Sequence, residues 1–90
     1  MEKHEKRLRS EAKFLTPILQ IGKNGLTEGS IGLLDRELDQ KHLIKVKLLK
    51  AALPESASKA DRRKMAAEMA ERTHAKIVEQ VGNIVVLYRG

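Results

Sequence analysis

The residues best suited to chemistry form a short loop, Gly22-Lys23-Asn24-Gly25-Leu26-Thr27. Two glycines three positions apart, with an asparagine between them, favour a turn with positive φ angles. Glycine also lets a sugar–phosphate backbone approach closely, and Lys23 adds a cation. Thr27 is a good N-cap for a following helix, whose unpaired backbone N–H groups attract anions. The loop therefore predicts a site for a phosphate backbone, and the alternative is an ordinary tight turn.

Such a loop needs a strand before it and a helix after it, and the hydrophobic pattern predicts both. A helix over residues 3–15 buries Leu8, Ala12 and Leu15 and stops before Pro17, and residues 18–21 form a short strand. After the loop, residues 27–40 form a helix with Glu28 in its first turn and an apolar stripe at Ile31, Leu34 and Leu38.

The second half of the chain adds two strands, a helix and a hairpin. Residues 43–49 alternate as a strand, with Lys45 and Lys47 on the face opposite the apolar side chains. Residues 51–57 contain Pro54 and are predicted to form a loop. Ser58 and Asp61 resemble a capping box that opens a helix over residues 59–73, in which Met65 and Met69 fill the core. Gly82-Asn83 joins the strands 76–81 and 84–89 as a hairpin.

These elements predict one domain over residues 1–90, in the order α-β-α-β-α-β-β. The two β-α-β crossovers favour parallel pairing with right-handed connections, and the closing hairpin adds an antiparallel strand. A chain of 90 residues cannot cover both faces of a sheet generously with helices. We therefore expect an α/β two-layer sandwich around a four-stranded mixed sheet.

The charge distribution favours a polyanionic partner. The chain has 18 lysines and arginines against 12 acidic residues, a net charge of +6, and residues 41–64 alone carry eight basic and two acidic side chains. The helix over residues 3–15 precedes the strand that feeds the loop, so its basic stripe is expected beside the loop as one continuous cationic surface. The alternative is a solvated, solubilising surface.

Two further pairs of cations are candidates for the same role. Lys45 and Lys47 either contact phosphate or solvate an exposed sheet face. Arg62 and Arg63 oppose the dipole of their helix, a local cost that a bound phosphate would relieve. The predicted RNA-binding residues are therefore Gly22, Lys23, Asn24, Gly25, Leu26, Thr27, Lys3, Lys6, Arg7, Arg9, Lys13, Lys45, Lys47, Arg62 and Arg63.

Composition and spacing exclude several other classes of function. Phe14 and Tyr88 are the two aromatic residues, too few for a base-stacking platform, so any RNA would be held through its backbone and shape. The histidines His4, His42 and His74 lack a nucleophile motif or metal-ligand spacing. Asp35 with Asp39, or Glu28 with Asp35, is typical of a solvated helix face. We expect no catalysis, no metal, no cofactor and no small-molecule substrate.

The cellular location is also constrained. The chain has no cysteine, which suits a reducing compartment, and no apolar run near the ~18 residues of a membrane span. Its charged first residues are unlike a signal peptide. We expect a cytoplasmic protein that does not bind a membrane.

Three segments in order resemble the CRM domain (chloroplast RNA splicing and ribosome maturation), the YhbY-like family. They are LTPILQIGKNGLTEG at 15–29, LIKVK at 43–47 and GNIVVLYR at 82–89. The resemblance implies a fold similar to the C-terminal domain of translation initiation factor three and RNA binding through the GxxG loop with neighbouring basic residues. Stand-alone prokaryotic members are associated with precursors of the large ribosomal subunit, and plant relatives with group II intron splicing. Residues 50–61 look closer to archaeal members than to bacterial ones, many of which continue beyond the last strand with a charged tail.

The sequence thus predicts a non-enzymatic protein that binds structured RNA, with ribosomal RNA during large-subunit assembly as the partner that the resemblance implies. One alternative is a nucleic-acid-compacting chromatin protein of the Alba kind, of similar size and related fold. The hairpin at Gly82-Asn83 is too tight and too neutral in overall charge for the DNA-binding arm of such proteins. Another alternative is a protein adaptor that presents Lys45 and Lys47 to acidic protein surfaces.

Overall fold

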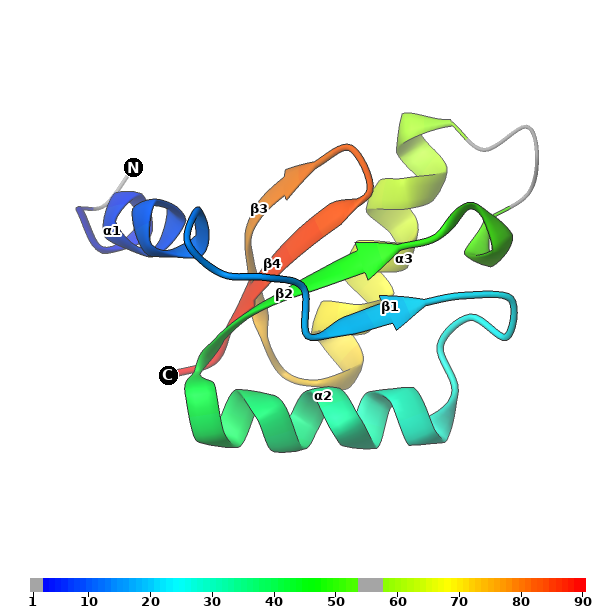
Figure 1. Ribbon diagram of the computed structural model, residues 1–90, viewed down its shortest axis with the longest axis horizontal. Coiled ribbons are helices and arrows are strands. Elements are labelled where there is room, and N and C mark those ends of the chain that lie inside the picture. The colour runs from blue at the N-terminus through cyan, green and yellow to red at the C-terminus, as the bar shows by residue number, and fades with distance from the viewer. Residues whose placement is uncertain (1–2, 54–57) are drawn as a thin grey trace.

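The computed structural model describes residues 3–53 and 58–90, with side chains described from Glu5 onward. The predicted order of elements is confirmed, with one added 3-10 helix, η1 (Figure 1). The elements are α1 (Lys3–Ala12), β1 (Leu19–Ile21), α2 (Glu28–Lys41), β2 (Leu43–Leu48), η1 (Lys50–Ala52), α3 (Lys59–Arg72), β3 (Lys76–Val81) and β4 (Ile84–Tyr88). The predicted loop with Pro54 lies partly outside the described residues.

The four strands form one mixed sheet in the order β1-β2-β4-β3. β1 and β2 are parallel, as their crossover predicts. β2 and β3 run in the same direction but do not pair, contrary to the prediction from the second crossover, because β4 lies between them and is antiparallel to both. The Gly82-Asn83 turn, with Gly82 at φ 57°, holds β4 beside β3. β4 is also the most continuously apolar strand, which suits a central position.

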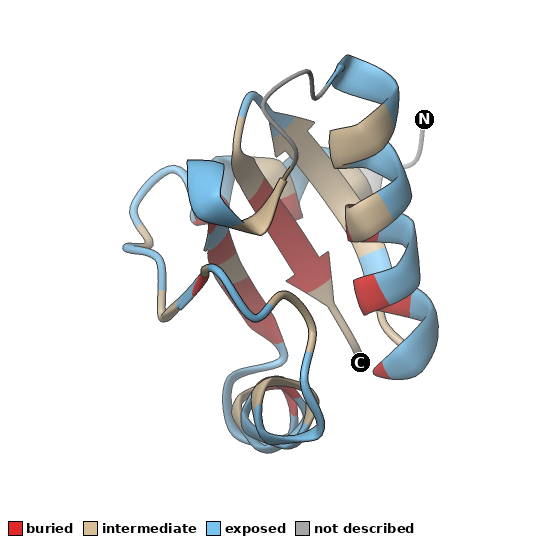
Figure 2. Cartoon of the chain, turned by 90° about the vertical axis from the view of Figure 1, so that its right-hand side faces the viewer, coloured by how far each residue is buried: buried red, intermediate tan, exposed pale blue. Residues whose placement is uncertain are grey.

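Helices α2 and α3 pack on one face of this sheet, which is called the first face below. Their fully buried side chains are Leu34, Leu38, Ala66 and Met69, which meet Ile21, Ile44, Val46, Leu48, Val85 and Leu87 of the sheet. Figure 2 shows these buried segments concentrated in the central strands. The sheet and these two helices form the predicted two-layer core, in which Met69 is buried as expected.

Helix α1 lies on the opposite, second face and covers only one end of it. Leu8 and Ala12 pack there against Leu43 and Val86, and an ion pair between Glu5 and Lys76 fastens the helix to β3. The Lys76 ammonium beside it lowers the pKa of the Glu5 carboxyl. The helix ends at Ala12 rather than at residue 15, because residues 13–15 form i to i−3 backbone hydrogen bonds that tighten its last turn.

Arg89, just after β4, joins three elements through its guanidinium group. Its Nη1 donates to Asp35 Oδ1 and, at 2.7 Å, to the carbonyl of buried Thr73. Its Nη2 donates to Asp39 Oδ1 and to the Asp35 carbonyl, each at 2.8 Å. Asp35 and Asp39 are exposed, as predicted for a solvated helix face, and both also bind Arg89, which lies about fifty positions further along the chain. The hydrogen bond and charge of Asp35 raise the pKa of Arg89.

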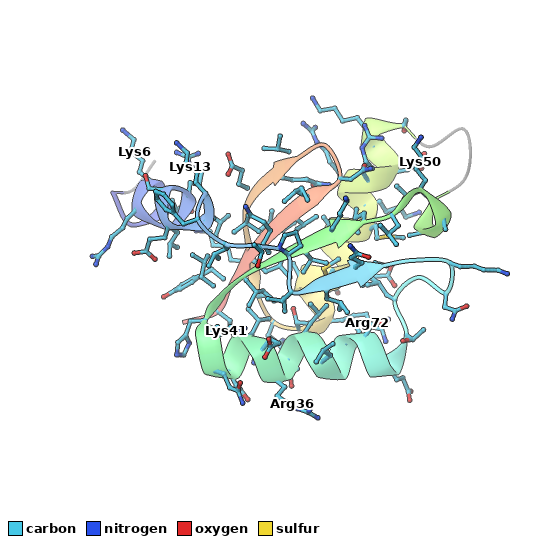
Figure 3. All side chains as sticks on the ribbon, viewed as in Figure 1. Lys6, Lys13, Arg36, Lys41, Lys50 and Arg72 are labelled. Atoms are coloured by element: carbon cyan, nitrogen blue, oxygen red, sulfur yellow. The ribbon has the colours of Figure 1, made fainter. Side chains whose placement is uncertain are left out.

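This clamp yields a stability prediction. Replacing Arg89 with Ala removes hydrogen bonds to charged groups and leaves the Thr73 carbonyl without that donor, so we expect a loss of about 2 kcal/mol of unfolding free energy. Urea unfolding measures it as a lower midpoint with an unchanged slope. The matched control is Arg36→Ala, an exposed arginine of α2 that points away from the molecule (Figure 3) and should change stability by less than ~0.5 kcal/mol. Equal losses in the two variants would contradict the clamp.

Candidate nucleic-acid interface

The loop between β1 and α2 is held in shape by its own backbone. The Gly25 N–H donates to the Gly22 carbonyl at 2.9 Å, which closes a four-residue turn. Gly25 has φ 64°, a value that other residues adopt only with strain, whereas space around it is open. The predicted positive φ is thus confirmed at Gly25. The turn leaves Lys23 and Asn24 exposed at its tip.

The next two residues of the loop fix it to the rest of the protein. Leu26 packs against the core of the first face. The Thr27 hydroxyl accepts the Ser30 N–H at 3.1 Å, so the predicted N-cap is confirmed and α2 begins directly at the loop. Both side chains are occupied by these structural contacts. Leu26 and Thr27 therefore fix the position of the turn.

A third anchor was not predicted. Arg72, at the end of α3, donates from Nη1 to the Leu26 carbonyl at 3.4 Å, and Figure 3 shows it near the start of α2. The sequence signal was limited to a basic residue in the last turn of a helix, which is common. The loop is therefore held from the side of α3 as well as from its own ends.

Helix α1 does not lie beside this loop, contrary to the predicted continuous surface. Figure 1 places α1 and the loop at opposite ends of the longest axis of the molecule, whose extent is 37 Å. Residues 15–21 explain the separation, because Pro17 keeps the chain extended and seven extended residues span up to about 23 Å. The strand that feeds the loop carries it away from α1 across the sheet.

The cations of α1 form two groups. Lys6, Arg9 and Lys13 line an open groove of about 310 Å³ that faces β3. Arg7 points elsewhere and pairs with Glu11 one turn on, with 3.5 Å between Nε and Oε1. Lys3 opens the helix, and its side chain lies outside the described part of the chain. The structure thus brings together three of the five cations predicted for the helix over residues 3–15.

Lys45 and Lys47 lie on the second face between the end covered by α1 and the end near the loop. Both point away from the α2–α3 core, Lys45 half-buried and Lys47 exposed. Lys45 lines a hollow together with Lys13, which directly follows α1. Lys47 pairs in register with Gln20, two positions before the loop. We use the name basic track for this series, which runs from α1 along β2 towards the loop: Lys6, Arg9, Lys13, Lys45 and Lys47.

Another cation lies at the loop end of the molecule. Lys50, in η1, is exposed at the same end as the loop (Figure 3). Parallel pairing of Ile21 with Leu48 brings the segments after β1 and β2 together, and Leu49 reaches the space beside Gly22. The position of Lys50 near the loop could have been found from the sequence, because two parallel strands end at the same edge of a sheet. Lys50 adds to the positive charge at the loop end of the molecule.

Arg62 and Arg63 belong to a separate place on the first-face side. With Lys59, Gln80 and Gly82 they line a pocket of about 50 Å³ between α3 and the hairpin. Ser58 and Asp61 form the predicted capping box, with the Ser58 N–H donating to Asp61 at 2.9 Å. This hydrogen bond lowers the pKa of the Asp61 carboxyl. The structure therefore places the two arginines apart from the basic track.

Other kinds of site find little support in the described residues. His42 and His74 are exposed, and His42 hydrogen-bonds the Arg89 carbonyl through Nδ1 at 3.0 Å. Within residues 3–53 and 58–90, no three His, Cys, Asp or Glu side chains gather as metal ligands would. No helix in those ranges is long and apolar enough to span a bilayer.

Comparison with known proteins places this chain and its fold among relatives. The family model described as CRS1 / YhbY (CRM) domain matches residues 1–89. A probable RNA-binding protein of Pseudomonas aeruginosa is 35% identical over 88 residues, covering 98% of this chain and 79% of the relative. A probable RNA-binding protein of Methanocaldococcus jannaschii, an archaeon, is 37% identical over 87 residues. That match covers 97% of this chain and 61% of the relative.

A solved structure supports the same assignment. The solution structure of a Staphylococcus aureus protein, SAV1595, superposes with a TM-score of 0.79 at 34% sequence identity. The match covers 98% of this chain and 85% of that one.

Proposed function

The chain belongs to the CRS1/YhbY (CRM) domain family, and on that premise we propose that it binds structured RNA through the phosphate backbone, without catalysis. Relatives from Pseudomonas aeruginosa and Bacillus subtilis are named probable RNA-binding proteins, which supports RNA as the partner. The proposal assigns the contact to the Gly22–Gly25 turn and to the basic track.

One observation carries this proposal: the closed turn at Gly22–Gly25 exposes Lys23 and Asn24 at the end of a sheet face lined with lysines. The turn needs no rearrangement to meet a ligand, because its own hydrogen bond and the Thr27 cap already fix it. Lys45 and Lys47 continue the positive charge across β2. Such an arrangement suits a backbone whose phosphates recur at regular intervals.

Recognition would depend on shape more than on sequence. Tyr88 is half-buried against the second-face cluster, and Phe14 is the one ring that is largely exposed, at 88%. Proteins that read single strands by stacking use several such rings. Contacts to phosphates and sugars position RNA without reading its sequence. We therefore assign the main affinity to backbone contacts on folded RNA.

The family resemblance extends the proposal to ribosomal RNA of the large subunit, bound in the cytoplasm while the subunit is assembled. Crosslinking in cells followed by sequencing of the bound RNA tests it. Reads should concentrate in large-subunit ribosomal RNA, above the level obtained with a Lys23→Glu/Asn24→Asp variant expressed to the same level. A profile that follows overall RNA abundance in both proteins would overturn the ribosomal assignment.

The nature of the nucleic acid is tested by titration of the purified protein with a folded ribosomal RNA fragment and a matched DNA duplex at two salt concentrations. The proposal expects tighter binding to RNA at both concentrations, with a steep salt dependence for each. Equal affinity for RNA and DNA would instead favour a chromatin-type protein. No binding to either would sink the proposed function.

A further inference from the structure

The second face of the sheet contains a hollow whose apolar floor and single carboxylate take no part in the backbone contacts above. It has a volume of about 210 Å³ and lies between the end of α1 and the β3–β4 hairpin. Its lining residues are Ala12, Lys13, Lys45, Glu79, Val81, Ile84 and Val86. The volume is below the ~300–1,000 Å³ of sites for drug-sized ligands, so it suits a single ring system.

The floor of the hollow is apolar and partly open to solvent. Val81 is 64% exposed, although it is a large apolar side chain in a strand. Ile84 pairs with it in register and is half-buried, and buried Val86 follows on the same face. A flat aromatic ring placed on these side chains would remove their exposed surface from water, which is favourable.

The rim of the hollow carries positive charges, which would attract the phosphates of a nucleotide. Lys13, directly after α1, and Lys45 of β2 line the hollow, and Lys6 and Arg9 line the adjoining groove. Phosphates on either side of a base held in the hollow would lie near these four cations. The apolar floor and the cationic rim together match the two parts of one RNA residue, a base and its flanking phosphates.

Glu79 is the one carboxylate that lines both the hollow and the groove. Its side chain is half-buried, and among the described residues no hydrogen bond or ion pair holds the carboxylate. An ionised carboxylate accepts hydrogen bonds at two oxygens and donates none. The Watson–Crick edge of guanine presents two adjacent donors, N1–H and the N2 amino group, which match this pair of acceptors.

We propose that the hollow binds one unpaired guanine of the RNA, stacked on Val81 and Ile84, with Glu79 accepting hydrogen bonds from N1–H and N2–H. The inference rests on the proposed RNA-binding function and adds to it a site that distinguishes one base. Uracil offers the carboxylate one ring N–H, and adenine offers an amino group beside an acceptor nitrogen. Inosine keeps N1–H and lacks the N2 amino group.

A simpler role for Glu79 makes an opposite prediction. If the carboxylate only offsets neighbouring lysines, its removal raises affinity for every RNA alike, because a negative charge leaves a cationic surface. If it reads guanine, Glu79→Gln removes the preference for guanine, because an amide has one acceptor oxygen and a donor in place of the second. The variant conserves shape, so folding should be unaffected.

The test is a fluorescence titration of the full protein with labelled uridine pentamers whose central base is guanine, inosine, adenine or uracil. Wild type should bind the guanine pentamer about tenfold or more tightly than the uracil one, with inosine between them. Glu79→Gln should bind all four within about threefold. Glu68→Gln, an exposed position on the outer side of α3, should keep the wild-type preference.

The two possible failures are distinguishable. Equal binding of all four pentamers by wild type, or a preference that survives Glu79→Gln, would overturn the guanine site while the folded RNA fragment still binds. A uniform rise in affinity with Glu79→Gln would assign Glu79 to charge balance and would also overturn it. Loss of binding to the folded fragment as well would overturn the proposed function and, with it, the guanine site.

Discussion

Replacing Lys23 with Glu and Asn24 with Asp lowers affinity for folded RNA about 100-fold at low salt. Both side chains are exposed at the tip of the turn, so the variant keeps its fold. It loses a charge-assisted hydrogen bond to phosphate, worth ~1.5–3 kcal/mol, and adds repulsion of the backbone from two new carboxylates. Titration with a ribosomal RNA fragment measures the effect, and circular dichroism checks the fold.

The chain offers a control with the same change in net charge. Arg36→Glu/Gln40→Glu also changes the charge by three units, on the exposed side of α2 and away from the turn. Its affinity should fall by less than about fivefold, because charges beyond a Debye length of ~10 Å are largely screened. If both variants lose affinity equally, binding follows total charge and the turn has no special role.

The second large effect concerns the sheet face. Lys45→Glu/Lys47→Glu should reduce affinity for the same RNA about 30-fold, because both lysines lie on the basic track between α1 and the loop. Lys45 is half-buried, so Lys45→Gln/Lys47→Gln provides a milder variant in which only the cations are removed. That variant should lose affinity by a smaller factor in the same direction.

The comparison for this pair is Arg62→Glu/Arg63→Glu, which makes the same change in charge at the α3 pocket. These arginines were also predicted to contact RNA, and the structure places them apart from the track. Unchanged affinity in this variant at low salt would remove them from the interface. A larger loss here than at Lys45 and Lys47 would move the interface to α3.

Local sequence signals predicted the elements that position the loop. Thr27 and Ser58 begin their helices as N-caps, and both accept the backbone N–H three residues ahead. Gly82-Asn83 closes the hairpin. Each of these signals acts within a few residues along the chain, so it can be read without knowing the tertiary structure.

Features that depend on distant contacts could not be predicted in the same way. The position of β4 between β2 and β3 reflects competition among strands for the most buried place. Arg89 pairs with Asp35 and Asp39, which lie 54 and 50 positions earlier in the chain. The charge pattern of α1 gave no indication of which end of the sheet it covers.

The candidate site was predicted in its parts and not in its arrangement. The turn, its positive φ and its place before a helix all follow from Gly22 to Thr27. The role of Lys45 and Lys47 as a link to α1 requires the register of β1 and β2, and the hollow beside Glu79 requires the packing of α1 on the second face. Side chains from α1, β2, β3 and β4 meet there, and spacing along one segment does not reveal them.

The most direct measurement of the central claim is the salt dependence of RNA affinity. Each phosphate contact contributes ~0.7–0.9 to the slope of log affinity against log salt. A Lys23→Gln/Lys45→Gln/Lys47→Gln variant should therefore have a slope about 2 units smaller than that of wild type on the same RNA fragment. An unchanged slope would mean that these three lysines touch no phosphates, and it would contradict RNA binding through the loop and the basic track.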